Sequence, residues 1–326
     1  MEKILLGNSD LEVSRLCFGG CPMGGYNWGE VSKIDLIKAV NEGIDNGINF
    51  FDSADTYGLG EGESTLSEAL GAKRSKVVIA TKFGVRVENG NTFYDNSPEW
   101  INYAVEKSLK RLRTDYIDLY QLHYRDSKTD INDVVETLDK LKQRGLIRNY
   151  GLSNVNQADI KELKYHTGKF VSFQNEFSLA CRKNEKDIFT LSQEIKASPL
   201  TWGSLGQGVL TGKYNINSRF ASNDRRSKEI YTNFHGEKFN RNLEIVNYLK
   251  EMSENLSKTI PAIAIRWILD YVPNSVVIAG IKNTDQLHSN ISALGWHLND
   301  NQINCLEQIS ILRDVMDYSE VAATNE

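Results

Sequence analysis

Short apolar runs alternate along the chain with longer segments in which apolar residues recur every three or four positions. The runs have the length of buried strands, and the longer segments have the period of helices that cover them. Strands are predicted at Leu16–Gly19, Ile48–Asp52, Val77–Lys82, Ile117–His123, Tyr150–Ser153, Phe170–Glu176, Ile195–Trp202 and Val276–Gly280. Helices are predicted between them near residues 33–46, 61–70, 98–112, 131–144, 157–166 and 187–194.

Eight strands that alternate with helices predict an α/β fold, a (β/α)8 TIM barrel, because each parallel pairing requires a crossover. An open doubly wound sheet is the alternative. Residues 4–13 are typical of two short strands joined by a turn, a β-hairpin that could close the bottom of the barrel. Residues 1–326 are predicted to form one domain, since barrels of this kind often exceed the usual domain length.

Two segments show how local signals enter the prediction. The helix at 98–112 has Ser97 as its N-cap and Pro98 at its first position, and its apolar residues at 101, 105, 109 and 112 form one stripe. Residues 212–236 lack any period and carry several arginines. They are too long for a plain connector, so we expect a functional or mobile loop.

Composition narrows the class of partner. The chain has 326 residues, 40% of them apolar, and 43 acidic against 38 basic side chains. A net charge of −5 gives no basic surface for nucleic acid or an anionic membrane, so small-molecule chemistry is expected. Four scattered cysteines are predicted to be reduced thiols. Without a signal-peptide pattern or a membrane span, we expect a cytoplasmic protein.

Titratable side chains end three of the predicted strands. Asp52, Lys82 and His123 each follow an apolar run, and Tyr57 comes soon after Asp52. A parallel barrel carries its active site at the carboxyl ends of its strands. We therefore expect these four residues to lie together.

The four side chains suit proton transfer to an oxygen. Tyrosine has an ordinary pKa of about 10, and a neighbouring lysine stabilises its phenolate. Asp52 would hold Lys82, and His123 would orient a substrate oxygen. None of the four is a suitable nucleophile, so a cofactor must supply one, and hydride is the natural candidate.

Two other functions remain open from the residues. One is a metal-dependent hydrolase on the same barrel, although the histidines are few and unclustered, and we predict no metal site. The other is a sensor or scaffold barrel that binds the hydride cofactor with little turnover.

Four motifs resemble the aldo-keto reductase superfamily: FDSADTYG at 51–58, TKFG at 81–84, DYIDLYQLH at 115–123 and GLSN at 151–154. The resemblance runs from near Gly7 to near Asn290. It implies a (β/α)8 barrel that binds NADPH without a Rossmann motif and reduces an aldehyde or ketone. It also implies Tyr57 as general acid, Lys82 and Asp52 as the pair that tunes it, and His123 as the carbonyl-orienting donor.

The same resemblance implies where the cofactor binds. Its carboxamide would meet Ser153, Asn154 and Gln174, and Trp202 would stack on the nicotinamide in place of the more usual tyrosine. The remaining cofactor residues are predicted at the pyrophosphate and the adenosine, namely Ser204, Leu205, Gly206, Lys213, Lys282, Gln286 and Asn290. Lys282 is the one convincing cation of the adenosine motif, so NADPH is preferred and NADH remains possible.

Aromatic residues are the candidates for the substrate pocket. Trp28, Phe83 and Tyr124, with Tyr231 or Phe234, could line an apolar mouth that suits aldehydes and ketones broadly. Each could equally be a packing residue. The sequence names neither the compound nor the oligomeric state.

Overall fold

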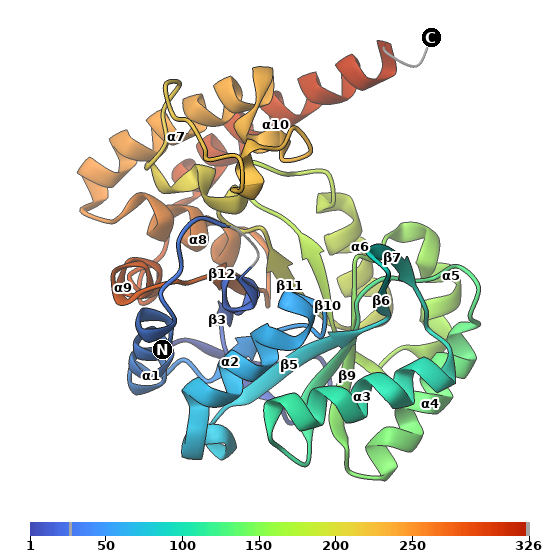
Figure 1. Cartoon of the computed structure of the whole chain (residues 1–326). Helices are drawn as coiled ribbons and strands as arrows, with labels where there is room; N and C mark the ends of the chain where they lie inside the picture. Colours follow the sequence, from blue (N-terminus) through green and yellow to red (C-terminus); the bar gives the residue numbers. More distant parts are fainter. Residues whose placement is uncertain (26–27, 324–326) are drawn as a thin grey trace.

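The structure, a computed structural model, describes residues 1–25 and 28–323, with side chains described as far as residue 311. Its centre is a closed barrel of eight parallel strands (Figure 1). Around the barrel the strands follow one another as β3 (Leu16–Gly19), β4 (Phe50–Asp52), β5 (Val78–Phe83), β8 (Ile117–Leu122), β9 (Ile147–Ser153), β10 (Phe170–Glu176), β11 (Ser198–Trp202) and β12 (Val276–Gly280). The predicted (β/α)8 barrel is confirmed, and the open sheet is wrong, because β12 pairs with β3.

Helices cover the outside of this barrel. They are α1 (Lys33–Asp45), α2 (Glu61–Leu70), α3 (Pro98–Leu112), α4 (Ile131–Gln143), α5 (Ile160–Leu163), α6 (Glu185–Ile195), α7 (Gly236–Leu256), α8 (Ile260–Tyr271), α9 (Thr284–Ile291) and α10 (Asp300–Ala323). In α3 the side chain of Ser97 accepts a hydrogen bond from the Trp100 N–H, as an N-cap does. Its predicted apolar stripe is buried at Ile101, Val105 and Leu112. None of the described helices is long and apolar enough to cross a membrane.

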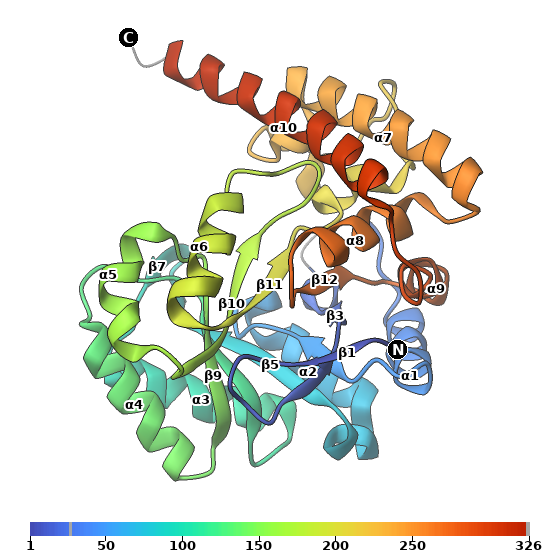
Figure 2. The same cartoon turned by 180° about the vertical axis from the view of Figure 1, so that it is seen from behind.

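The chain begins with the predicted hairpin, β1 (Lys3–Leu5) and β2 (Glu12–Ser14). Leu6, Leu11 and Val13 are buried and join the cluster of side chains inside the barrel. The Gly7 N–H donates to Ser198 Oγ at 2.8 Å, at the start of β11. Figure 2 shows the hairpin lying across one end of the barrel. The hairpin therefore closes the bottom, opposite the carboxyl ends of the strands.

Several elements differ from the sequence prediction, which contained none of the helices α7 to α10. A second hairpin, β6 (Val85–Glu88) and β7 (Asn91–Tyr94), follows β5 and was not predicted. The helix expected at 157–166 is broken into the 3-10 turn η4 (Gln157–Asp159), the single α-helical turn of α5 and a further 3-10 turn, η5 (Lys164–His166). A capping box between Asn156 and Asp159 tightens the first turn into a 3-10 conformation.

Candidate active site

The carboxyl ends of β4, β5 and β8 bring together the four residues singled out in the sequence. Lys82 Nζ lies 2.6 Å from Asp52 Oδ1 and donates to Tyr57 Oη at 3.3 Å. The imidazole of His123 meets the Tyr57 ring edge-on, with 6.4 Å between ring centroids. Lys82 is fully buried and Asp52 is 2% exposed. An acid, an amine, a phenol and an imidazole thus share one small volume at the top of the barrel.

The charge of Lys82 is matched by several acceptors. Besides Asp52 and Tyr57, its ammonium donates to the Ser53 carbonyl at 2.8 Å. The other carboxylate oxygen of Asp52 accepts from Gln174 Nε2 at 2.8 Å and from Gln121 Nε2 at 3.2 Å. A hydrogen bond donated to Tyr57 Oη favours the phenolate, so this arrangement makes the phenol a better proton donor.

Gln121 was missed in the sequence. It lies two residues before His123 on β8, and residues two apart on a strand share a face. The alternation of side chains along the strand therefore places Gln121 inside the barrel, one layer below His123. Its contact with Asp52 makes it a supporting residue of the site.

His123 is held neutral. Burial, and then the positive charge of Lys82, hold the pKa of His123 well below its ordinary value. Its backbone is fixed on both sides, because its N–H donates to the Phe83 carbonyl at 2.9 Å and its carbonyl accepts from Asn154 Nδ2 at 3.1 Å. A neutral imidazole carries one N–H, which can be donated to a substrate oxygen.

The residues expected at the nicotinamide carboxamide lie beside these four. Ser153 Oγ donates to the Gln174 carbonyl at 3.0 Å, and Asn154 Nδ2 donates to Ser153 Oγ at 3.1 Å. Asn154 has a left-handed backbone with φ of 53°, which turns the chain sharply at the end of β9. The side-chain amide of Gln174 is turned toward Asp52, so its first role is to hold that carboxylate.

The expected nicotinamide and pyrophosphate segment follows β11. Trp202 is the last residue of β11, and its indole Nε1 is buried without a hydrogen-bond partner among the described residues. Ser204 Oγ donates to the Thr201 carbonyl at 2.9 Å. Leu205 precedes the 3-10 turn η6 (Gly206–Thr211), and Gly206 has a φ of 56°. A side chain at Gly206 would lie 2.8 Å from Val209, so the backbone needs glycine there.

Basic side chains gather beyond this turn. Lys282 contacts the Trp28 carbonyl, which also accepts from Arg226 Nη2 at 3.1 Å. Burial, and then the charge of Arg226, lower the pKa of Lys282, and Lys213 acts in the same direction. Asp224 pairs with Arg226 and partly offsets this positive charge. Three cations against one carboxylate suit a ligand with phosphate groups.

The contacts of Arg226 also give residues 212–236 a role. Arg226 joins this segment to the loop after β3 by donating to the Trp28 carbonyl, and Asp224, in the same segment, pairs with Arg226. The sequence predicted a functional or mobile loop here and pointed to its arginines, Arg226 among them, but it gave no role to Arg226 or Asp224. In an irregular segment no regular repeat of apolar residues indicates which side chains point toward the protein.

The adenosine motif occupies the start of α9. Gln286 Oε1 accepts from the Lys282 N–H at 3.0 Å, and Asn290 lies one turn further along the helix. Asn290 is 2% exposed, and its Nδ2 has no partner among the described residues. The unpaired Nδ2 of Asn290 and Nε1 of Trp202, together with the basic side chains, fit a dinucleotide that accepts hydrogen bonds and carries phosphates.

The aromatic pocket is only partly as predicted. The ring of Trp28 meets Tyr231 edge-on at 5.2 Å, and Tyr124 stacks on His123 at 5.0 Å. Phe234 is buried among other aromatic rings and does not line a mouth.

Phe83 is a correction to the predicted pocket. Lys82 points into the barrel, so its neighbours on β5 point out toward the helices. Thr81 accordingly donates to Glu63 on α2 at 2.6 Å, and Phe83 is fully buried against Tyr120 at 4.6 Å. Phe83 is a packing residue between the barrel and its helices.

In the part of the chain that the structure describes, no three His, Cys, Asp or Glu side chains are grouped as metal ligands would be. The metal-dependent hydrolase considered above needs such a group.

Comparison with known proteins decides the family. The model of the aldo/keto reductase family matches residues 15–311. The chain belongs to the aldo/keto reductase family. Among curated aldo-keto reductases, YhdN of Bacillus subtilis is 31% identical over 302 residues, 92% of this chain and 90% of that protein. The NADH-specific methylglyoxal reductase of Escherichia coli is 28% identical over 328 residues, 95% and 98% of the two chains.

Solved aldo-keto reductases share the fold. The glycerol dehydrogenase AKR11B4 from Gluconobacter oxydans superposes with a TM-score of 0.85 at 31% identity, over 94% of both chains. The holo form of AKR11C1 from Bacillus halodurans gives a TM-score of 0.77 at 30% identity, over 95% of this chain and 96% of the other. Membership of this family makes the protein a carbonyl oxidoreductase of the kind that uses a nicotinamide cofactor.

Proposed function

We propose that this aldo-keto reductase uses NADPH to reduce an aldehyde or ketone to the alcohol, with Tyr57 as the proton donor. The observation that carries the proposal is the position of the Lys82 ammonium, 3.3 Å from Tyr57 Oη and 2.6 Å from Asp52 Oδ1. The buried cation lowers the cost of forming the phenolate, and the carboxylate holds the cation in place. These contacts tune the phenol as an acid.

The chain's own residues divide the work of the reaction. A bound nicotinamide supplies the hydride. Tyr57 Oη and the N–H of neutral His123 would both meet one carbonyl oxygen, the first to protonate it and the second to orient it. After Tyr57 has given its proton, its phenolate is stabilised by Lys82. Ser153, Asn154 and the carbonyl oxygen of the Gln174 side chain would hold the carboxamide of the nicotinamide, so that its ring could present one face to the substrate.

We propose that NADPH is preferred and that NADH is also accepted. Lys282 is a half-buried cation next to Arg226 at the start of the adenosine motif, where a 2′-phosphate would gain a charged hydrogen bond. The neighbouring Gln286 is uncharged, and the similar enzyme from Escherichia coli is NADH-specific by name. Both facts argue for a preference of moderate size.

The test compares the wild type with Tyr57→Phe on a panel of carbonyl compounds. Oxidation of NADPH and of NADH is followed with aldehydes, ketoses, quinones and ketosteroids, first with the wild type. Tyr57→Phe is then expected to bind NADPH nearly as before, while reduction falls by about 10²- to 10⁴-fold, the range of a lost general acid. Equal turnover by wild type and Tyr57→Phe would contradict the role of Tyr57. Single-turnover absorbance that stays constant for hours with every compound would favour an NADPH sensor.

A further inference from the structure

Among the described residues, none makes the hydrogen bond to the His123 imidazole that usually fixes a functional histidine. Its Nδ1 is enclosed and has no partner within the described residues. A ring nitrogen bonded to a carboxylate or carbonyl would set both tautomer and orientation. Here the orientation must come from the rings that touch the imidazole.

Two tyrosines form a stack behind that imidazole. Tyr124 lies on His123 with 5.0 Å between ring centroids and an interplanar angle of 26°. Tyr94 lies on Tyr124 with 4.9 Å and 18°. Three rings are therefore layered from the catalytic histidine outward to β7, and Tyr94, the outermost, is 44% exposed.

The backbone around this stack is fixed as well. The side chain of Asn96, just after β7, donates to the Tyr124 carbonyl at 3.1 Å and accepts from the Asp126 N–H at 2.8 Å. The Asp95 N–H donates to the Gly84 carbonyl at 3.0 Å, at the foot of the β6–β7 hairpin. The hairpin and the segment that follows His123 are thus joined at a fixed distance, which keeps Tyr94 in register with Tyr124.

We propose that Tyr94 is a positioning residue, which through Tyr124 holds the His123 imidazole in the orientation that meets the substrate carbonyl. The catalytic part of this statement rests on the function proposed above; the ring-positioning part does not. Stacked aromatic pairs prefer offset, near-parallel arrangements and resist rotation out of them. Without Tyr94, one face of Tyr124 opens to water, and the ring that limits the rotation of the imidazole is itself held less firmly.

The test compares Tyr94→Ala with Tyr94→Phe, which keeps the ring, and with Phe93→Ala as a matched control. Phe93 is 39% exposed on the same strand, and its ring packs on Arg86. Its side chain points to the other face of the hairpin. Circular dichroism checks that each variant is folded, and because both side chains are exposed the barrel should remain intact.

The first readout is the proton–carbon NMR spectrum of the His123 ring in the free protein, assigned by its loss in His123→Asn. Tyr94→Ala should shift these resonances because ring-current effects from the stack change, whereas Tyr94→Phe and Phe93→Ala should leave them in place. The second readout is steady-state carbonyl reduction. Tyr94→Ala should lower kcat by about tenfold, with little change in the Kd for NADPH.

His123 resonances that stay in place in Tyr94→Ala would overturn the proposal. Equal shifts in Phe93→Ala would also overturn it, because the hairpin as a whole and not the Tyr94 ring would then be responsible. If the His123 resonances shifted in Tyr94→Ala but kcat stayed the same, Tyr94 would hold the imidazole without contributing to catalysis. If no carbonyl compound were reduced by any form of the protein, the function proposed above would fail, and the spectrum would still decide whether Tyr94 holds the imidazole.

Discussion

At the scale of single residues, the site is organised around the ammonium of Lys82. A lysine without exposure loses its charge unless acceptors surround it. Lys82 has three, Asp52, the Ser53 carbonyl and Tyr57 Oη, and the far oxygen of Asp52 is held by two glutamine side chains. Protein groups alone thus supply hydrogen-bond partners to both Lys82 and Asp52 in their ion pair. The site is therefore organised before any ligand binds, which lowers the cost of reaching the transition state.

The neutral state of His123 predicts how stability depends on pH. Its pKa is held well below the ordinary value in the folded protein, whereas the unfolded chain has a histidine pKa of about 6.5. Below that pH, His123 becomes protonated in the unfolded chain but stays neutral in the folded protein. The free energy of unfolding therefore falls as pH falls. We expect the wild type to lose about 1 kcal/mol more than His123→Asn between pH 7.5 and 5.5. Urea unfolding at both pH values measures the difference, and equal losses would contradict it.

Individual site residues were predictable where they broke a pattern. Asp52, Lys82 and His123 stand out because each ends an apolar run with a charged or titratable group. For Phe83 the sequence left a pocket role and a packing role equally open, and alternation along β5 from the inward-pointing Lys82 indicates the packing role. Arg226 lies in an irregular segment, where neither period nor neighbours give the direction of a side chain.

At the scale of elements, two tight turns determine where Tyr57 lies. The 3-10 turn η1 (Cys21–Gly24) follows β3, and η2 (Tyr57–Gly60) follows β4. A side chain added at Gly24 would lie 2.5 Å from the carbonyl carbon of Tyr57 and 2.7 Å from the Gly58 nitrogen. The absence of a side chain at Gly24 lets the two turns touch through their backbones. The Tyr57 backbone is therefore positioned in part by the turn that follows the neighbouring strand β3.

This contact predicts the effect of Gly24→Ala. Because the neighbouring atoms are backbone, the Tyr57–Gly58 peptide must move, and displacements of about 1 Å at a reacting group can cost about 10²-fold in rate. We expect kcat for carbonyl reduction to fall at least about tenfold, with a smaller change in NADPH binding. Gly43→Ala in α1 is the control, since its added carbon meets the nearest side chain at an ordinary 3.5 Å. A Gly24→Ala enzyme with full activity would show that the contact is unimportant.

Strands and helices could be predicted from the sequence where burial of one face makes apolar residues recur at regular positions. The barrel strands and most of the helices show an apolar pattern because one face of each meets the core. The β6–β7 hairpin has almost no buried face, and all four residues of β7 are exposed. Its one signal was Asn89-Gly90 at the turn, where φ values of 52° and 79° fit a two-residue type I′ loop. Such turn chemistry is informative when hydrophobic periodicity is absent.

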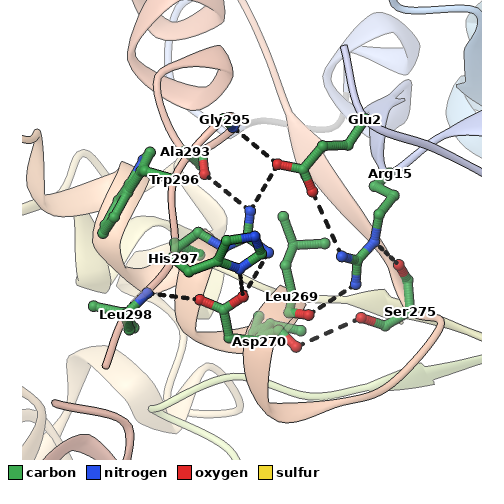
Figure 3. A network of polar contacts seen from close by, with 12 residues as sticks. Glu2, Arg15, Leu269, Asp270, Ser275, Ala293, Gly295, Trp296, His297 and Leu298 are labelled. Atoms are coloured by element: carbon green, nitrogen blue, oxygen red, sulfur yellow. Dashed lines mark hydrogen bonds and ion pairs between the residues drawn. The ribbon is translucent and has the colours of Figure 1, made fainter. Parts of the chain in front are cut away.

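At the scale of the whole molecule, a network of charges joins the start of the chain to its last third (Figure 3). Glu2 accepts from Arg266 Nη1 and from the Gly295 N–H, both at 2.9 Å, and pairs with Arg15 at 3.5 Å. Arg266 is fully buried and also pairs with Asp270 at 2.8 Å. Closure of the barrel could be predicted by counting strands, but the contacts of Glu2 with Arg266 and Gly295 span more than 260 residues and leave no local sequence signal.

Glu2→Gln should therefore destabilise the fold as a whole. It leaves Arg266 enclosed with one carboxylate fewer beside Arg15, and we expect a loss of about 2 kcal/mol in the free energy of unfolding at pH 7. Burial would raise the pKa of Glu2, but the Gly295 N–H and the charges of Arg266 and Arg15 lower it overall. Its contribution is complete above the unfolded pKa of about 4.3 and disappears as pH falls through the lower folded pKa, so wild type and variant should converge near pH 3.

Urea unfolding with Glu12→Gln as the matched control separates this network from an ordinary surface pair. Glu12 pairs with Lys3 on the same hairpin, but both side chains are exposed, 59% and 41%. Such a pair contributes about 0.5 kcal/mol or less. Equal destabilisation by the two substitutions would mean that the charge of Glu2 acts only at the surface. A large loss for Glu2→Gln alone would mean that the N-terminal hairpin closes the barrel and also neutralises the buried arginine of α8.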